Sequence, residues 1–345
     1  MKLSILCAGL TLAASAAIAD PVEDFYKGKQ IQIVVGYEAG GGYDVYARLV
    51  ARHFGAFVPG KPGVVVQNMP GAGSLRSANY ITVTAPKDGT TLATFGRNIP
   101  LMGVLGGNAN VQFDARKWTW LGSPSSAQDD AYTLWVRKDA KAKNLQDALR
   151  PGGPEIILGG TSEGSTDSDV PALMRKTIGL NFRIVSGYPG SNGINIAIER
   201  NEVEGRFIGH SAVVSTQPGW LKPDSFMHPL MQFARPNRLP GYPDVPTARE
   251  LAKDPKSRQL IELAEIPYML SRPIVGPPDI PADRAKALQK AFLDMTKDPG
   301  FLADAEKLKV DVSPVGADEA LHMLQMLAGA PEDLKDEIRK LQSGG

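Results

Sequence analysis

Three consecutive glycines, Gly40 to Gly42, follow a short apolar run at residues 31–35 and precede a segment with helical spacing. The large apolar residues of that segment recur at steps of four, four and three, at Tyr46, Val50, Phe54 and Phe57. A strand, a glycine loop and a helix in this order aim backbone N–H groups and the positive end of the helix at an anion. Glycine lacks a Cβ, so a ligand can come close to the backbone. The pattern predicts an anion-binding loop, although such glycines also serve strand–helix turns alone.

The first nineteen residues have the features of a secretory signal. Lys2 is the only charge among them, residues 3–17 are apolar or small, and Ala17-Ile18-Ala19 forms a small-x-small site. We therefore expect a signal peptide at residues 1–19 that is cleaved after Ala19. Cys7, the single cysteine, lies inside this segment. The mature chain would then have no disulfide, no thiol nucleophile and no thiolate metal ligand.

The charge balance of the mature chain argues against polyanionic partners. Without Lys2 the chain has 37 basic and 37 acidic residues. A chain with no net charge and no basic run is a poor candidate for binding nucleic acid or an anionic membrane. Its length is typical of about two domains.

Short apolar runs alternate with helical segments along the chain, which predicts an α/β architecture. The predicted strands lie at residues 31–35, 64–66, 91–95, 133–136, 155–158, 183–185 and 205–208. Proline-rich stretches at 235–243 and 273–281 interrupt the pattern, and Pro281 suits the first position of a helix.

Three loops rich in glycine follow predicted strands, at residues 40–44, 71–74 and 159–166. Several such loops in one α/β protein predict a cleft lined by backbone N–H and hydroxyl groups, which suits a carboxylate or a phosphate. Asp44 either caps the first helix or braces the first loop. Arg97 and Arg272 lie near strand ends, where each could bind a ligand carboxylate or form a structural ion pair.

The third loop also contains the pattern G-x-S-x-G at residues 160–164, which occurs at the nucleophile of α/β-hydrolases. A secreted serine hydrolase using Ser162 is therefore the alternative interpretation. That fold needs an acid and then a histidine after the serine, and only His210 lies near a suitable loop.

Metal and dinucleotide sites are not indicated. The histidines at positions 53, 210, 228 and 322 have no metal-ligand spacing, and H-E-x-x-H is absent. The first glycine loop lacks G-x-G-x-x-G because Tyr43 and Asp44 interrupt it. We expect neither a metal nor a cofactor.

Four groups of motifs, in order along the chain, resemble the Bug family of periplasmic solute receptors of tripartite tricarboxylate transporters. They are VGYEAGGGYD at 35–44, NMPGAG at 68–73 with DGTTL at 88–92, GYPGS at 187–191 with NEVE at 201–204, and PDVPT at 243–247. Together they extend across nearly the whole mature chain.

The resemblance implies a two-lobed periplasmic-binding-protein fold of type II, with a ligand cleft between the lobes. Lobe one would combine residues 20–124 and 238–345, and lobe two would be residues 125–237. The implied protein is a monomeric, non-enzymatic, periplasmic receptor for a small di-, tri- or aromatic carboxylate. Its partners would be the permease subunits of a tripartite transporter.

The family binds its ligands mainly through backbone amides, hydroxyls and bridging water, more than through arginine. The resemblance, with the loops above, implies a ligand-binding set of Tyr37, Ala39, Gly40, Gly41, Gly42, Tyr43, Gly160, Thr161, Ser162, Gly164, Ser165, Thr166, Tyr188, Arg97 and His210. Two departures stand out. Glu38 and Ala39 replace prolines, and Tyr43 replaces a small hydroxyl residue. A carboxylate at Glu38 would repel an anion unless it points away, and Tyr43 would narrow the pocket or stack on an aromatic ligand.

Overall fold

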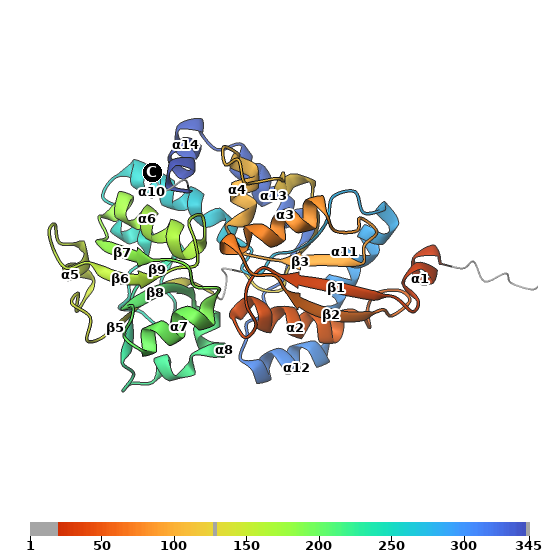
Figure 1. Ribbon diagram of the computed structural model, residues 1–345, viewed down its shortest axis with the longest axis horizontal. Helices are drawn as coiled ribbons and strands as arrows, with labels where there is room; N and C mark the ends of the chain where they lie inside the picture. The colour runs from red at the N-terminus through yellow and green to blue at the C-terminus, as the bar shows by residue number, and fades with distance from the viewer. Residues whose placement is uncertain (1–19, 127–129, 343–345) are drawn as a thin grey trace, which may run out of the picture.

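The alternating strands and helices form two separate mixed β-sheets in the computed structural model, which describes residues 20–126 and 130–342 (Figure 1). Helices cover both sheets, and the two halves of the molecule lie side by side. We call the first sheet with its helices lobe one and the second sheet with α5 to α10 lobe two.

The first sheet has the strand order β11-β4-β10-β3-β1-β2. Its strands are β1 (Gln30–Val35), β2 (Gly63–Asn68), β3 (Thr91–Thr94), β4 (Thr119–Ser123), β10 (Ile274–Gly276) and β11 (Val315–Gly316). β1 pairs in parallel with β2 and β3, whereas β10 runs antiparallel to both β3 and β4. A strand from the C-terminal part of the chain thus completes a sheet begun by the N-terminal part.

The second sheet repeats this plan with the order β7-β6-β8-β5-β9. Its strands are β5 (Tyr132–Arg137), β6 (Ile156–Gly159), β7 (Phe182–Val185), β8 (Gly205–Gly209) and β9 (Met227–Phe233). β6 is parallel to β7 and β8, and β5 is antiparallel to β8 and β9. In both sheets the glycine loops follow parallel strands, so they reach the same edge of their sheet.

The helices lie between and around these strands. They are α1 (Pro21–Tyr26), α2 (Gly42–Phe54), α3 (Leu75–Val83), α4 (Ile99–Leu105), α5 (Leu145–Leu149), α6 (Thr166–Ile178), α7 (Ser191–Glu199), α8 (His210–Thr216), α9 (Ala248–Leu251), α10 (Pro255–Glu265), α11 (Ala282–Met295), α12 (Pro299–Leu308), α13 (Ala317–Ala328) and α14 (Glu332–Gln342). Among the described helices, none is long and apolar enough to cross a membrane.

Two local expectations differ from the structure. α2 ends at Phe54, so Phe57 lies beyond the helix, although it still packs against the same core. Pro281 is the residue before the first turn of α11 and not its first helical residue. Its φ of −48° and ψ of 134° place it in the extended conformation that precedes a helix.

Beyond residue 237 the chain still contacts elements of the second half of the molecule. α9 packs on β9, and α10 packs on both α6 and α14. The chain then reaches β10 through a short 3₁₀ helix, Ile266–Met269. The proline-rich stretch at 235–243 is therefore a turn within lobe two, since Gln232 in β9 bridges to Thr247.

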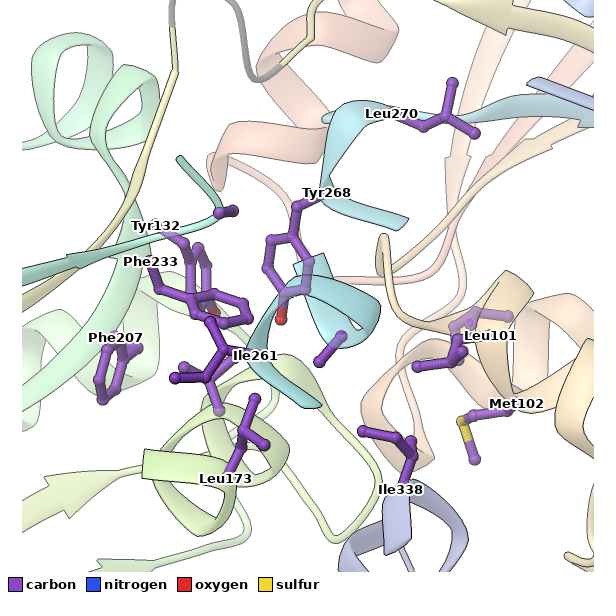
Figure 2. Packing of buried hydrophobic residues seen from close by; sticks show 14 of the residues in the cluster. Leu101, Met102, Tyr132, Leu173, Phe207, Phe233, Ile261, Tyr268, Leu270 and Ile338 are labelled. Carbon is purple, nitrogen blue, oxygen red and sulfur yellow. The ribbon is translucent and has the colours of Figure 1, made fainter. Parts of the chain in front are cut away.

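Strand β1 buries side chains on both of its faces. Ile31, Ile33 and Val35 pack with α2, α11 and α12, whereas Val34 packs on the opposite face, as the two-residue period of a strand requires. The core containing Val34 continues into lobe two (Figure 2). Leu101 of α4 and Ile338 of α14 belong to the same apolar cluster as Leu173 of α6 and Ile261 of α10. Apolar packing therefore joins the two lobes in this conformation.

Candidate functional site

A small cavity lies at the junction of the two lobes. The cavity volume is about 40 Å³. Lobe one and lobe two both contribute to its wall, which consists of Tyr37, Gly41, Gly42, Tyr43, Arg97, Tyr132, Thr161, Thr166, Asp167, Ser191, Arg206, Ile208, Gly209, Ala212 and Arg272.

The first glycine loop forms the lobe-one wall and is braced by Asp44. The Asp44 carboxylate accepts hydrogen bonds from the backbone N–H of Gly40 at 2.9 Å and from Nδ2 of Asn68 at 2.9 Å, and it pairs with Arg48 at 2.8 Å. Of the two roles considered for Asp44, the structure shows the brace. The cap position of α2 is Gly41, which makes no side-chain capping bond. This leaves the loop fixed with Gly41 and Gly42 facing the cavity.

Two stacked tyrosines form an aromatic wall beside the loop. The rings of Tyr37 and Tyr43 lie 4.9 Å apart with an angle of 26° between their planes. The Tyr43 hydroxyl accepts a hydrogen bond from the backbone N–H of Arg97 at 3.0 Å. The guanidinium of Arg272 lies over the Tyr43 ring at 4.9 Å, a cation–π arrangement that fixes both side chains. Tyr43 therefore narrows the pocket, as its size predicts.

A buried charge cluster lies next to these rings. Arg97 and Arg272 are 3 % and 2 % exposed, and Asp130 is fully buried. One Asp130 oxygen lies 3.6 Å from Arg97 and 4.0 Å from Arg272. Burial alone raises the pKa of Asp130, but the two guanidinium charges and the hydrogen bonds from Ser211 outweigh it and hold the pKa below its usual range. Asp130 is therefore an anion between two cations.

Lobe two contributes a second ion pair with hydroxyl groups around it. Arg206 of β8 lies 4.0 Å from Asp167 at the start of α6. Asp167 accepts a hydrogen bond from Thr161 at 3.1 Å, and Tyr132 donates to Thr166 at 2.8 Å. Burial raises the pKa of Tyr132 above its ordinary value, so this phenol stays neutral. The wall thus combines cations with neutral hydroxyls.

Seven residues of the predicted set line the cavity: Tyr37, Gly41, Gly42, Tyr43, Arg97, Thr161 and Thr166. The others lie outside its wall. Ala39 and Gly40 contact lobe two, because Asn192 donates a hydrogen bond to the Ala39 carbonyl at 3.1 Å and its amide nitrogen approaches Gly40. Glu38 points away from the cavity, and its Oε1 accepts from the backbone N–H of Gly193 at 2.9 Å.

The third glycine loop packs against lobe one beside the cavity. Gly164 accepts a hydrogen bond from the Asn98 side chain. A Cβ at Gly73, in the second glycine loop, would lie 2.8 Å from Oγ of Ser162 and 2.7 Å from Cβ of Ser165. Gly73 has a φ of +59°, so a glycine is needed there both for the conformation and for the close approach. The second and third loops therefore meet each other.

The remaining predicted residues support these loops. Gly160 donates from its backbone to Val185 at 3.0 Å and accepts from the backbone of Tyr188. His210 begins α8 and packs edge-on against Tyr242 at 5.2 Å. Oγ of Ser162 is buried and has no hydrogen-bond partner among the described residues. Ser162 is thus not paired with His210 or any other base in the described part of the chain.

Sequence reasoning did not include Tyr132, Asp167, Ser191, Arg206, Ile208, Gly209 and Ala212, and it considered Arg272 without placing it in the set. Arg206 and Gly209 lie in β8 and Tyr132 begins β5. A signal for Arg206 was present, since it is a charged residue within an apolar strand at 205–208. Within the described ranges, no group of three metal-binding side chains is present.

Comparison with known proteins adds short sequence matches. No family model matches the chain. It is 37 % identical over 92 residues to the UPF0065 protein in the gbd 5′ region of Cupriavidus necator, and 40 % identical over 89 residues to the protein BugT of Bordetella pertussis. These alignments cover 27 % and 26 % of both chains, so the matched part spans about a quarter of the length of these relatives.

Similarity to solved structures extends over nearly the whole chain. The periplasmic binding protein BugD superposes with a TM-score of 0.71 at 16 % identity, over 92 % of this chain and 98 % of BugD. MatC from Rhodopseudomonas palustris with bound malate superposes with a TM-score of 0.66 at 18 % identity, over 91 % of this chain and 99 % of MatC. A second R. palustris protein, with adipate, superposes with a TM-score of 0.68 at 18 % identity, over 91 % of this chain and 97 % of that protein.

These superpositions confirm the two-lobed periplasmic-binding-protein fold that the motifs imply. The sequence matches to BugT and the UPF0065 protein confirm the resemblance to the Bug family.

Proposed function

We propose that this chain, with the motifs and fold of the Bug family, is a periplasmic receptor that binds a small organic carboxylate between its lobes. The observation that carries the proposal is the cavity at the lobe junction, with three buried arginines in its wall. A guanidinium is planar and always charged, and it matches a carboxylate with two parallel hydrogen bonds.

The lobe junction gives the receptor a way to respond to its ligand. Contacts between the lobes lie on both sides of the cavity, from Glu38 to Gly193 and from Asn98 to Gly164. A ligand that touches both walls favours the closed form by its extra contacts there. We assign lobe one to residues 20–123 with the chain from β10 onward, and lobe two to the sheet of β5 to β9 with α9 and α10.

The named structural neighbours support the ligand class, since one contains malate and another contains adipate. The composition of residues 1–19 supports export and a signal peptide cleaved after Ala19. The resemblance supports the remaining parts of the proposal: a periplasmic, monomeric receptor and delivery of the ligand to membrane permease subunits.

The proposed receptor is not an enzyme. A nucleophilic serine needs a base within hydrogen-bond reach. Ser162 has no such partner in the described structure, and His210 packs against Tyr242. Ser162 instead lies at the contact between the second and third glycine loops.

A thermal-shift screen of the protein expressed from residue 20 tests the proposal. The panel contains mono-, di-, tri- and aromatic carboxylates, with sugars and inorganic cations as controls. At a concentration about 100-fold above Kd, a ligand stabilises the folded state by about 2.7 kcal/mol. For a chain of this size we expect a rise in Tm of roughly 5 °C. Shifts with sugars or cations and with no carboxylate would contradict the proposal.

A further inference from the structure

The buried charges around the cavity do not balance. Its wall contains three guanidinium groups, from Arg97, Arg206 and Arg272. Two buried carboxylates lie within 4.0 Å of them, Asp130 and Asp167. One positive charge is therefore left over among these buried groups.

Arg206 is not the source of this surplus. It lies 4.0 Å from Asp167 and donates hydrogen bonds to the Ser191 carbonyl at 3.0 Å and to Oδ1 of Asn195 at 3.0 Å. Its charge is paired and its donors are used within lobe two.

The surplus belongs to Arg97 and Arg272, which share a single carboxylate. Asp130 is already hydrogen-bonded, since it accepts from the backbone N–H groups of Ala131 and Ser211 at 2.9 Å each and from Oγ of Ser211 at 3.0 Å. Its nearest contacts with the two guanidinium groups, at 3.6 and 4.0 Å, are longer than hydrogen bonds. Asp130 therefore neutralises one charge without occupying the arginine donors.

The two arginines differ in the donors that they leave unpaired. Nη1 of Arg272 donates to the Ser271 carbonyl at 2.8 Å and Nη2 donates to Oγ of Ser211 at 3.1 Å, so its buried Nε is the donor without a hydrogen-bond partner among the described residues. The terminal nitrogens of Arg97 donate no hydrogen bond within the described ranges; its side chain reaches only the Tyr43 hydroxyl, from Nε at 3.5 Å. Unpaired buried donors are costly, and Arg97 lines the cavity, where a ligand oxygen could accept from its terminal nitrogens.

The other ionisable groups nearby do not pair with Arg97 or Arg272. Tyr37 and Tyr132 are neutral because burial raises the pKa of each phenol. The charge of Glu38 acts on Arg206, where it opposes the lowering of the pKa by burial, and Asp44 is paired with Arg48; neither carboxylate lines the cavity.

We propose that the closed cavity selects a singly charged acid, a monocarboxylate whose carboxylate is bound by Arg97 and Arg272 and whose remainder lies against Tyr37, Tyr43 and Tyr132. This inference rests on the proposed function and narrows its ligand class. One negative charge neutralises the cavity. The second charge of a dicarboxylate would meet a wall whose remaining guanidinium, Arg206, is already paired with Asp167, so its burial would be unfavourable.

Isothermal titration with matched acids tests the inference. The pairs are propionate and malonate, butyrate and succinate, and benzoate and phthalate, each with the chain from residue 20 at pH 7.5. We expect the monocarboxylate to bind at least 10-fold more tightly than its partner in every pair that binds. Equal or tighter binding of the dicarboxylates overturns the inference and leaves the proposed receptor function standing. Binding of no carboxylate at all overturns both.

Charge variants provide an independent test. Asp130→Asn keeps an acceptor for the Ala131 and Ser211 N–H groups and raises the cavity charge by one, so it should shift the preference toward the dicarboxylate by at least 10-fold. Arg97→Met should weaken monocarboxylate binding at least 10-fold, whereas Arg97→Lys should retain part of the binding. This second test stands even if Asp130→Asn fails to fold.

Arg258→Gln is the matched control, because the side chain of this arginine is 58 % exposed on α10 and pairs with Glu262. It changes the net charge of the protein and should leave all affinities within about 2-fold of the wild type. Circular dichroism and Tm establish that each variant is folded. An unchanged acid preference in folded Asp130→Asn, or unchanged binding in folded Arg97→Met, overturns the inference.

Discussion

Glu38 of lobe one caps a helix of lobe two, and its removal should weaken ligand binding without changing the cavity. The N-cap residue of α7 is Gly190, which provides no side-chain acceptor. Oε1 of Glu38 accepts from the N–H of Gly193 in the first turn of this helix at 2.9 Å. The first four N–H groups of a helix lack intrahelical partners, so a carboxylate from the opposite lobe satisfies one of them only when the lobes are together.

The size of the effect follows from two terms. Loss of a capping acceptor costs about 1 kcal/mol, and loss of a negative charge at a helix N-terminus costs about 0.5 kcal/mol at a half-exposed site. Together they disfavour the closed form by roughly 1.5 kcal/mol, which is about 10-fold in the closing equilibrium. If the open form predominates without ligand, the apparent Kd rises by the same factor.

Glu38→Ala should therefore raise the Kd of the best acid about 10-fold in isothermal titration. Glu38→Gln keeps an acceptor and should raise it only about 3-fold. Glu23→Ala, an exposed change on α1 in lobe one, should have no effect. Small-angle scattering should show that Glu38→Ala needs more ligand to reach the compact form. An affinity of Glu38→Ala within about 2-fold of the wild type would refute the idea that Glu38 stabilises the closed form by capping α7.

Three further outcomes are expected. Burial raises the pKa of Asp169 to about 7, so the stabilisation of the fold by the protonated carboxyl is complete below the unfolded-state pKa near 4 and is lost as the pH rises to 7. Urea unfolding between pH 4.5 and 8 should show a smaller loss of stability with pH in Asp169→Asn than in the wild type. An unchanged pH slope in the variant would contradict this. Gly209→Val should reduce acid binding at least 10-fold by titration, because its Cβ would lie 3.1 Å from Arg97 and 3.3 Å from Asp130; retained affinity in a folded variant would show that this wall is not used. Ser162→Ala should change the affinity less than about 3-fold, and the wild type should form no fluorophosphonate adduct by mass spectrometry; a stoichiometric adduct at Ser162 would favour the hydrolase.

The local elements followed from the sequence because their signals are local. The glycine loop at 40–42 lies between β1 and α2 as predicted, and the predicted runs at 133–136 and 205–208 fall within β5 and β8. The family motifs at these positions added the two-lobed arrangement, which no single element specifies.

The charge cluster could not be predicted in the same way. Asp130, Arg206 and Arg272 are far apart in the sequence and share no motif. They meet because the two halves of the molecule lie side by side and bring residues in or next to β5, β8 and β10 together at one cavity. The expectation that amides and hydroxyls would dominate the site came from the family pattern, whereas in this chain buried guanidinium groups form much of the wall.

The function of Glu38 depended on the lobe arrangement as well. From the sequence, a carboxylate beside an anion site was unfavourable unless it pointed away. Its orientation toward Gly193 became evident only from the position of α7 in the other lobe. The position of α10 has a similar cause, since nothing in its sequence indicates the helices α6 and α14 on which it packs.

The most direct test of the account is a crystal structure of the protein with the monocarboxylate that binds most tightly. The account predicts the acid in the cavity between the lobes, with its carboxylate oxygens within hydrogen-bond distance, about 3 Å, of Arg97 and Arg272. An acid bound outside this cavity, or inside it with its carboxylate directed away from both arginines, would contradict the central claim.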